Sequence, residues 1–317
     1  MRYLLKKLYR PEYFQGAHRL RQYFEGWYFK FSFQGEAFAV IPGISRTDPH
    51  AFIQVIQGSA GLSSYHRFDA GSFRSRRDRF QIEVGENLFS LERVRIRLQG
   101  FEAELQTMER IRWPSSPLAP SSMGWYSFVR FMECYHGVIV LDALAEGRVN
   151  GRPRSAGRFY LEKDWGSSFP RAWIWMQSND FGGRPASLTC SVARVPFRGR
   201  EFTGFIAGLL AGGVLYRFAT YNGARLEQAS ASAGQVEVVL RRGALSLRLR
   251  AARRAGAGLA SPVDGEMRGR IVESLRSEVE VRLTRAGRTL FEGTGTCAGL
   301  EVVRPEELSR AEARFPA

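Results

Sequence analysis

The stretch RFYLEKDWGSSFPRAWIWMQSNDF, residues 158–181, decides how the rest of this chain is interpreted. It consists of two extended runs joined by the turn sequence Gly-Ser-Ser-Phe-Pro. Because side chains alternate between the two faces of a strand, Tyr160, Glu162 and Asp164 are predicted to share one face. Burying carboxylates costs several kcal/mol unless they are paired or protonated. The stretch therefore predicts either a structural ion pair or an acid held in an apolar pocket.

Indole rings accompany these carboxylates. Trp165 lies at the end of the first run, and Trp173 and Trp175 alternate in the second. Asn179 is predicted to share the face of Trp173 and Trp175. For the ion-pair alternative, the basic partners of Glu162 and Asp164 are expected among three nearby residues: Arg158, Lys163 and Arg171.

Short alternating runs recur along the chain. Residues 25–33, EGWYFKFSF, place Glu25, Trp27 and three phenylalanines on one face of a strand. Turns with Gly or Asn separate such runs, which is typical of antiparallel sandwiches and barrels. We therefore expect an all-β protein of two tandem antiparallel β-barrel or sandwich domains after a short N-terminal lead-in. The Gly-rich segment 146–153 is the expected boundary, which gives domains of residues 1–153 and 154–317.

Two segments do not follow the strand pattern. Residues 1–22 form a basic amphipathic lead-in, predicted either to pack on the body as a helix or to touch a membrane. Residues 113–122, WPSSPLAPSS, contain three prolines and cannot form a central strand. This loop is predicted either to cover a pocket or to cross the edge of a sheet.

The chain is strongly basic, with a formal net charge of +15 over 317 residues. Such a charge favours nucleic acid or an anionic membrane surface as a partner. Only four of the 46 basic residues are lysine, however, and an Arg-rich composition also follows from base composition alone. No helix-turn-helix, zinc-finger or RNA-binding signature is present, so we expect no nucleic-acid partner. If the charge is functional, peripheral contact with a lipid surface is the expected use.

Three widely spaced cysteines, Cys134, Cys190 and Cys297, form neither a disulfide framework nor a metal-binding pattern. The N-terminal apolar run is interrupted by Lys6 and Lys7 and does not have the form of a signal peptide. The longest apolar segment, residues 204–216, is too short to span a membrane. These features predict reduced thiols and a cytoplasmic location, either free or at the membrane surface.

The residues available for chemistry are carboxylates, one histidine and aromatic rings. Phosphate-binding loops, nucleophile elbows, zinc motifs and dinucleotide fingerprints are absent, so we expect no cofactor and no metal. An apolar interior favours the neutral form of a carboxylic acid, which could then protonate an alkene. Nearby indole and phenol faces would stabilise the resulting carbocation. Asp164 and Glu162 are the first candidates for this acid, before Glu25 and Glu133. His136 is either a core histidine or the base that accepts a phenol proton.

Several motifs together resemble the tocopherol cyclase family. They are residues 25–30 (EGWYFK), 42–45 (PGIS), 131–137 (FMECYHG), 162–170 (EKDWGSSFP) with 173–179 (WIWMQSN), and 298–302 (AGLEV). Residues 25–28 are also similar, more distantly, to a signature of carotenoid hydratase-like and Diels–Alderase-like calycin proteins. The resemblance implies lipocalin-like (calycin) barrels around an apolar pocket, in a chain that looks like a bacterial member.

The resemblance further implies an intramolecular cyclase that closes a chromanol-type ring from a prenylated hydroquinone or a related isoprenoid. We expect Asp164 to be the acid, with Glu162 second and with His136 or Tyr160 assisting at the phenol. Two alternatives remain open: a carrier of an apolar isoprenoid or lipid without catalysis, and a hydratase in which water captures the cation. The side chains expected to line the pocket around the ligand are Glu25, Trp27, Tyr28, Glu133, Tyr135, Trp165, Trp173, Trp175 and Asn179.

Overall fold

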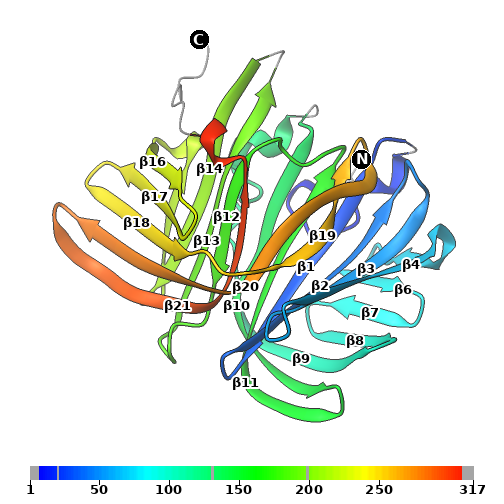
Figure 1. Ribbon diagram of the computed structural model, residues 1–317. Coiled ribbons are helices and arrows are strands. Elements are labelled where there is room, and N and C mark those ends of the chain that lie inside the picture. The colour runs from blue at the N-terminus through cyan, green and yellow to red at the C-terminus, as the bar shows by residue number, and fades with distance from the viewer. Residues whose placement is uncertain (1–6, 20, 130–131, 198–199, 309–317) are drawn as a thin grey trace. The chain divides into compact units, whose positions relative to one another are not determined.

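A computed structural model of the protein describes residues 7–19, 21–129, 132–197 and 200–308 (Figure 1). The structure consists almost entirely of antiparallel strands with short 3-10 turns, which confirms the all-β prediction. No helix in these four ranges is long and apolar enough to cross a lipid bilayer. Of the predicted lead-in helix, residues 1–6 and residue 20 lie outside the described residues. The described part contains a 3-10 turn, η1 (Gly16–His18).

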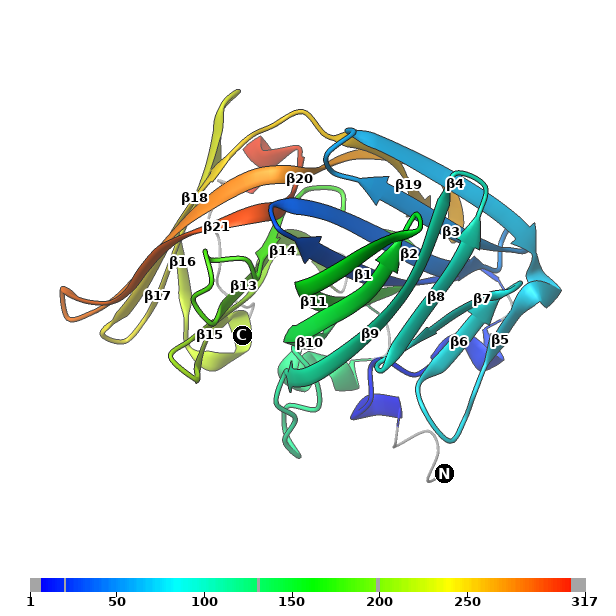
Figure 2. The ribbon, with the colours of Figure 1, turned by 90° about the horizontal axis from the view of Figure 1, so that it is seen from below.

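Among the described residues, the first sheet has 11 strands in the order β4-β3-β2-β1-β11-β10-β9-β8-β7-β6-β5. Figure 2 shows β1, β11, β10, β9 and β8 side by side. The sheet is a chain of hairpins that returns to place β11 beside β1, with η2 (Ala70–Ser72) and η3 (Gly124–Phe128) in the connections. Its strands are β1 (Phe24–Phe33), β2 (Glu36–Ser45), β3 (His50–Gln57), β4 (Leu62–Asp69), β5 (Phe73–Ser75), β6 (Gln81–Val84), β7 (Asn87–Ser90), β8 (Arg93–Leu98), β9 (Phe101–Arg112), β10 (Cys134–Val149) and β11 (Arg152–Gly166).

The second sheet has 10 strands among the described residues, in the order β15-β14-β13-β12-β21-β20-β18-β17-β16, with β19 paired to β20. Two 3-10 turns, η4 (Thr220–Asn222) and η5 (Pro305–Glu307), accompany it. Its strands are β12 (Trp173–Ser178), β13 (Ala186–Phe197), β14 (Arg200–Ala211), β15 (Val214–Ala219), β16 (Arg225–Ala231), β17 (Gln235–Arg242), β18 (Leu245–Ala252), β19 (Ala257–Val263), β20 (Glu266–Arg285) and β21 (Arg288–Val303).

The chain forms two compact units, and the division falls later than the sequence predicts. Unit 1 comprises residues 1–57, 62–169 and 259–270, and unit 2 comprises residues 58–61, 170–258 and 271–317. The expected boundary at Pro153 lies at the start of β11, which pairs with both β10 and β1. A strand held on both sides by the first sheet cannot belong to the second unit, so the chain leaves unit 1 only after Phe169.

Each unit has its own apolar core, as expected for two separate β domains. In unit 1 the core takes every second residue of the central strands. Trp27, Phe29 and Phe31 of β1 lie opposite Lys163, Leu161 and Phe159 of β11 in the pairing register. All six side chains are fully buried. The intervening residues of β11 therefore lie on the other face of this sheet, which is where the candidate site is found.

Candidate functional site

Strand β11 carries two different polar groups on its two faces. Tyr160, Glu162 and Asp164 lie on the face away from the unit 1 core, whereas Lys163 lies among the core residues. The strand alternates as the sequence predicts, because each side chain points to the face opposite that of its neighbours. The buried ionisable side chains on each face need hydrogen-bond or ion-pair partners, and the partners differ between the two faces.

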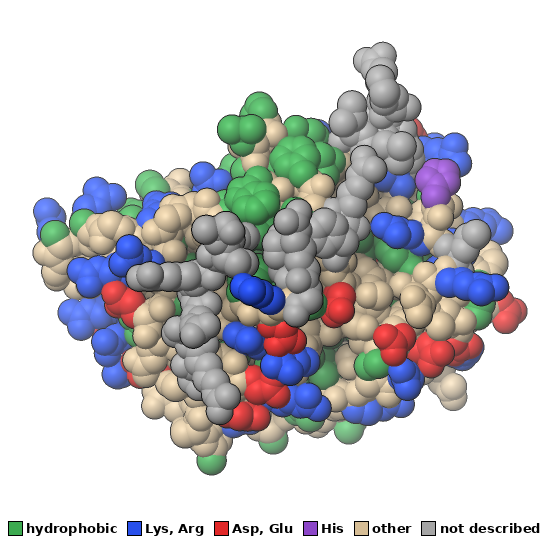
Figure 3. Space-filling model, turned by 90° about the horizontal axis from the view of Figure 1, so that it is seen from above, with side chains coloured by type: hydrophobic (Ala, Val, Ile, Leu, Met, Phe, Trp, Pro, Cys, Tyr) green, Lys and Arg blue, Asp and Glu red, His purple; other side chains and the backbone are tan. Residues whose placement is uncertain are grey.

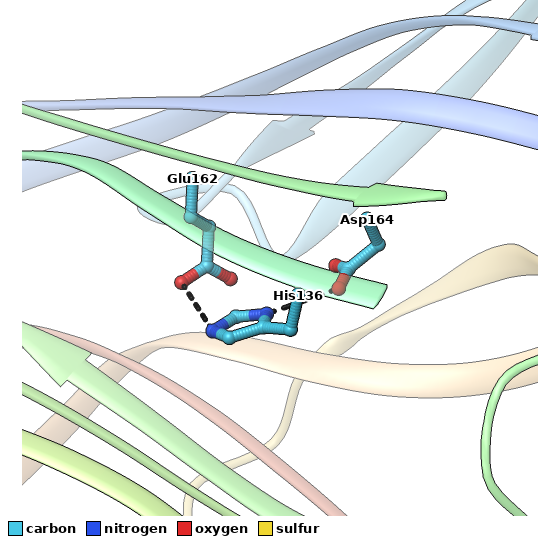
Figure 4. Close-up of side chains that lie close together, drawn as sticks. All are labelled: His136, Glu162 and Asp164. Carbon is cyan, nitrogen blue, oxygen red and sulfur yellow. Dashed lines mark hydrogen bonds and ion pairs between the residues drawn. The ribbon is translucent and has the colours of Figure 1, made fainter. Parts of the chain in front are cut away.

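A hydrogen-bonded cluster occupies the face away from the core (Figure 4). His136 of β10 is the register partner of Asp164, and its Nδ1 lies 3.0 Å from Asp164 Oδ1. Its other ring nitrogen, Nε2, lies 3.7 Å from Glu162 Oε2. The Tyr160 hydroxyl donates to the same Glu162 oxygen over 2.5 Å. We call these four residues the His136 cluster. Its members follow one another from a phenol through a carboxyl group and an imidazole to a second carboxyl group, with hydrogen bonds at both ends and an ion-pair distance between Glu162 and His136.

Burial within the His136 cluster is graded. Tyr160 is fully buried, and the Glu162 side chain is 5% exposed. The side chains of His136 and Asp164 are 16% and 24% exposed, respectively. A buried carboxyl group requires hydrogen-bond partners, and Tyr160 supplies one to Glu162. The path therefore runs from a water-excluded end at Tyr160 to a more accessible end at Asp164.

The same side chains could also hold a cation. His136, Glu162 and Asp164 each offer a ligand atom, and these atoms lie within 4.8 Å of one another. One imidazole and two carboxylates form a donor set that divalent metals accept. In the present geometry, however, each imidazole nitrogen faces a carboxylate oxygen, as in a proton relay.

Cysteine chemistry does not contribute to this site. Cys134 is close enough to Asp164 and Glu133 for their charges to act on its thiol. Burial, followed by these two carboxylates, raises the pKa of Cys134 well above its usual range. The thiol therefore stays protonated at neutral pH and is a weak nucleophile. All three cysteines are free, in agreement with the sequence.

The proline-rich loop holds the His136 backbone in place. β10 pairs with β9 only from Val140 onward, so residues 136–138 have no strand paired on that side in the part of the chain that the structure describes. The Ser122 hydroxyl donates to the His136 carbonyl and accepts from the Val138 N–H, at 3.1 and 3.0 Å. Met123 Sδ lies 3.2 Å from the His136 backbone nitrogen. Sequence reasoning missed both residues, because nothing in a proline-rich loop indicates which strand it will contact.

The loop also contributes to a pocket: Trp113, Ser115, Pro120 and Ser121 are among its lining residues. The pocket has a volume of about 260 Å³ and lies between the lead-in, the loop and β10. Val138, one of its lining residues, is the register partner of Glu162. The remaining lining residues are Tyr9, Arg10, Pro11, Arg112 and Ile139.

On the core face, Lys163 forms a fully buried ion pair with Glu25, with Nζ 2.5 Å from Oε1. Lys163 also donates to the carbonyl oxygens of Pro11 and Tyr13 in the lead-in. Its ammonium group lies 4.7 Å from the ring centres of both Trp27 and Trp165. Burial lowers the pKa of Lys163 to about 8, although Glu25 opposes this shift. We call this group, Lys163 with Glu25, Trp27 and Trp165, the Lys163 clamp, because it fastens the lead-in to the sheet.

The expected ionic partners of Glu162 and Asp164 were wrong. Arg158 pairs with Asp142, with Nη1 3.2 Å from Oδ2, and Arg171 pairs with Glu201 and Glu307. Lys163 lies on the opposite face of β11 from both carboxyl groups and pairs with Glu25. Alternation explains this only for Lys163, because Arg158 shares the face of Glu162 and Asp164 and Arg171 lies beyond the end of β11. For the two arginines, the pairing was decided by Asp142, Glu201 and Glu307, which are distant in sequence.

The remaining predicted residues are distributed over both units. Tyr28 is the register partner of Glu162 and lies on the same face as the His136 cluster. Glu133 is exposed, and its backbone carbonyl, not its carboxyl group, accepts a bond from Ser167. The Tyr135 ring stacks on Trp165 with centroids 5.3 Å apart. Three residues belong to unit 2 and lie on or just after β12: Trp173, Trp175 and Asn179.

In unit 2, the Trp173 indole donates from Nε1 to Glu301 Oε2 over 2.7 Å. Gln177 donates to Asn179 Oδ1 over 3.4 Å. Trp173, Trp175 and Asn179 are all largely buried. Trp173 and Trp175 alternate with Ile174 and Met176, which belong to the unit 2 core, so both indoles lie on the face of β12 away from that core.

Comparisons with known proteins agree with this fold. The protein called CghA, in its crystal structure with Sch210972, has a TM-score of 0.56 to this chain. The two chains are 11% identical in sequence, and 89% of each is covered. A second crystal structure of CghA gives the same TM-score at 12% identity, covering 92% of this chain and 89% of that one. This likeness supports the fold of two antiparallel sheets.

Sequence comparison identifies the family. A probable chloroplastic tocopherol cyclase of Oryza sativa subsp. japonica is 30% identical over 80 residues. The chloroplastic tocopherol cyclase of Zea mays gives the same identity over the same length. These alignments cover 23% of this chain and 16% of each plant protein. The profile of the tocopherol cyclase-like family matches residues 93–303, which include the whole His136 cluster and two-thirds of the sequence. The chain therefore belongs to the tocopherol cyclase-like family.

Proposed function

We propose that this protein is an acid-catalysed intramolecular cyclase, which closes a chromanol-type ring on a prenylated hydroquinone or a related isoprenoid. The observation that carries the proposal is the His136 cluster, a set of adjacent proton-bearing groups whose Tyr160 and Glu162 end is buried, in the region matched by the family profile. Membership of the tocopherol cyclase-like family and the chemistry available to these groups support the proposed substrate class.

The reaction needs only the movement of one proton. An acid protonates the prenyl double bond, forming one C–H bond and a tertiary carbocation. The phenol oxygen attacks this cation, forming the C–O bond, and the phenol proton passes to a base. The acid gives one proton to the substrate and the base recovers one proton from it, so the product is an isomer of the substrate. A connected acid and base can therefore complete the cycle without an external oxidant or reductant.

Within the cluster we assign the acid to Glu162 and not to Asp164, which the sequence favoured. A group that protonates an alkene must be shielded from water, and Glu162 is the less exposed of the two, at 5% against 24%. Asp164 accepts a hydrogen bond from His136 Nδ1, which fixes the ring with Nε2 towards Glu162. His136 then accepts the phenol proton and returns it to Glu162, and Tyr160 orients the carboxyl group.

The proposed partner is an apolar small molecule with an isoprenoid chain. Such molecules dissolve in membranes, so the proposal includes contact between the basic surface of the protein and a lipid bilayer. A net charge of +15 is consistent with that contact.

The test is turnover of a prenylated hydroquinone by purified protein in D₂O. A cyclase returns a chromanol that carries one deuterium at the protonated carbon. Glu162→Gln is expected to lower turnover by roughly 10²–10⁴-fold, the usual contribution of a general acid. Asp164→Asn is expected to lower it less, because His136 remains in place. Turnover retained in Glu162→Gln, with an unchanged melting temperature, would show that Glu162 is not the acid.

The two alternative functions give different products in the same assay. A carrier returns the hydroquinone unchanged and without deuterium. A hydratase incorporates oxygen from the solvent, so the product formed in ¹⁸O-labelled water gains the label, whereas a cyclisation product does not. Mass spectrometry of the extracted product therefore separates the three functions.

A further inference from the structure

We propose that residues 114–129 of unit 1, here called the apolar loop, dock the protein onto an anionic lipid bilayer. This stretch presents three large apolar side chains to solvent. Leu118 is 81% exposed, Phe128 is 46% exposed and Trp125 is 41% exposed. Exposed apolar side chains are ordinary when scattered singly, but three within eleven residues of one loop indicate a contact surface. The inference rests on the proposed function in one respect only: the cyclase activity would explain why the protein needs to reach a substrate dissolved in a membrane.

The backbone of the apolar loop projects these side chains outward. Ser116 and Ala119 exchange two backbone hydrogen bonds and close a tight turn, which places Leu118 at its tip. Trp125 and Phe128 both belong to the 3-10 turn η3. Residues three apart in a 3-10 turn lie on the same side, so the two rings share one face. Gly124 and Tyr126 of the same turn are buried, and the Tyr126 ring stacks on the Trp125 indole with ring centres 4.2 Å apart.

Hydrogen bonds along the loop hold this shape. Tyr9 of the lead-in donates its hydroxyl to the Pro117 carbonyl, and Ser115 donates to the Pro120 carbonyl. The hydroxyl groups of Ser121 and Ser127 lie 2.7 Å apart and join the two halves of the loop. A preformed surface loses little conformational entropy when it meets its partner. The loop is therefore ready for contact without rearrangement.

The charge at the base of the loop favours anionic headgroups. Arg10 and Arg112 line the pocket beside Pro120, with side chains 50% and 33% exposed. Among the described residues, both guanidinium groups pair with the single carboxylate of Glu12, so the three side chains together carry one net positive charge. Figure 3 shows hydrophobic side chains gathered on a projection of the molecule, with basic side chains nearby. An apolar tip above a cationic base matches the order of layers in a membrane surface, where acyl chains lie beneath anionic headgroups.

A partner protein would require different features. A stable protein interface buries roughly 800 Å² on each side and surrounds its apolar centre with a polar rim. The apolar loop instead exposes only three large apolar side chains, a Leu, a Trp and a Phe, and Trp is enriched at the level of lipid headgroups. The lipid surface is therefore the occupant that fits this geometry.

The experiment is co-sedimentation of full-length protein with vesicles of phosphatidylcholine alone or with 30% phosphatidylglycerol added, without any substrate, so its result does not depend on catalysis. Wild-type protein is expected to bind the anionic vesicles and to bind more weakly in high salt. Leu118→Asp is expected to lower the partition coefficient on the order of tenfold, and the double variant Trp125→Ser with Phe128→Ser to lower it at least as much. Val214→Asp is the matched control, because Val214 is 50% exposed in unit 2.

Each outcome decides the proposal. Loss of binding in the loop variants but not in Val214→Asp supports it, provided that all variants have wild-type melting temperatures. Equal binding by wild-type protein and the loop variants overturns it. It is also overturned if wild-type protein does not bind vesicles. A change in oligomeric state caused by Leu118→Asp, measured by light scattering without vesicles, would instead identify the loop as a contact between copies of the chain.

Discussion

The variant Lys163→Met tests how much the buried ion pair of the Lys163 clamp contributes to the stability of the fold. At a separation of 2.5 Å and an effective dielectric constant of about 20, the attraction between Lys163 and Glu25 is about 7 kcal/mol. Most of this attraction is offset by the cost of removing both charges from water. Removing one partner of such a pair costs about 3–5 kcal/mol, because the other charge remains buried without its counterion.

The surroundings of Glu25 place the expected cost at the lower end of that range. Its carboxylate still accepts hydrogen bonds from the Gln15 and Gly16 backbone amides and from the Tyr23 hydroxyl. We therefore expect Lys163→Met to lower the free energy of unfolding by about 3 kcal/mol. For a typical dependence of the unfolding free energy on urea concentration, this loss lowers the midpoint of urea unfolding by roughly 1–2 M. Fluorescence of Trp27 and Trp165 follows this transition, because both indoles contact Lys163.

Two further variants make the experiment decisive. The double variant Glu25→Gln with Lys163→Met removes both charges and is expected to recover at least half of the loss. Arg67→Gln breaks an ion pair with Asp48 in which both side chains are 51% exposed. It is expected to cost at most about 1 kcal/mol. If Lys163→Met costs no more than Arg67→Gln, or if the double variant is less stable than the single one, the account of the clamp is incorrect.

Two other predictions concern Ser122 and His50. Ser122→Ala leaves the His136 carbonyl and the Val138 amide without this partner, so kcat is expected to fall about tenfold with little change in KM. Ser122→Thr is expected to restore kcat, whereas a purely structural role would appear only in the melting temperature. Burial is the main cause that lowers the pKa of His50, whose ring contacts Tyr65 and the Asp48 carbonyl beside Arg67. In the unfolded chain His50 takes up a proton below about pH 6.5, whereas in the folded protein it stays neutral to lower pH. Neutral His50 therefore costs no folding free energy above pH 6.5, and the free energy of unfolding decreases as the pH falls below 6.5. Urea midpoints at pH 7.5 and 5 are expected to differ less in His50→Asn, and an equal difference would refute the assignment.

The sequence was sufficient for the strand pattern but not for the partners of individual residues. Alternation in residues 158–165 and 25–33 correctly separates the core face from the other face. That His136 would lie opposite Asp164 depends on the pairing of β10 with β11, and this register includes bulges that no local pattern specifies. The family resemblance grouped these residues without indicating their contacts.

The division between the units shows the same limit. A Gly-rich turn marks residues 146–153, and it is indeed a tight connection, but between two strands of one sheet. Turn composition predicts where a chain reverses, and it does not distinguish a hairpin from a domain boundary. The pairing of β11 with β1, at the opposite end of unit 1 in the sequence, settles the difference.

The alternation of Glu162 and Lys163 on β11 also constrains how this family can vary in sequence. Because the strand repeat is two residues, an insertion or deletion of one residue between 159 and 165 would exchange the faces of every side chain beyond it. Such a change would bring an ammonium group to the imidazole and a carboxyl group among the phenylalanines. Length differences among homologues should therefore be confined to the hairpin around residues 150–153, while this short span keeps a constant length even where its side chains differ.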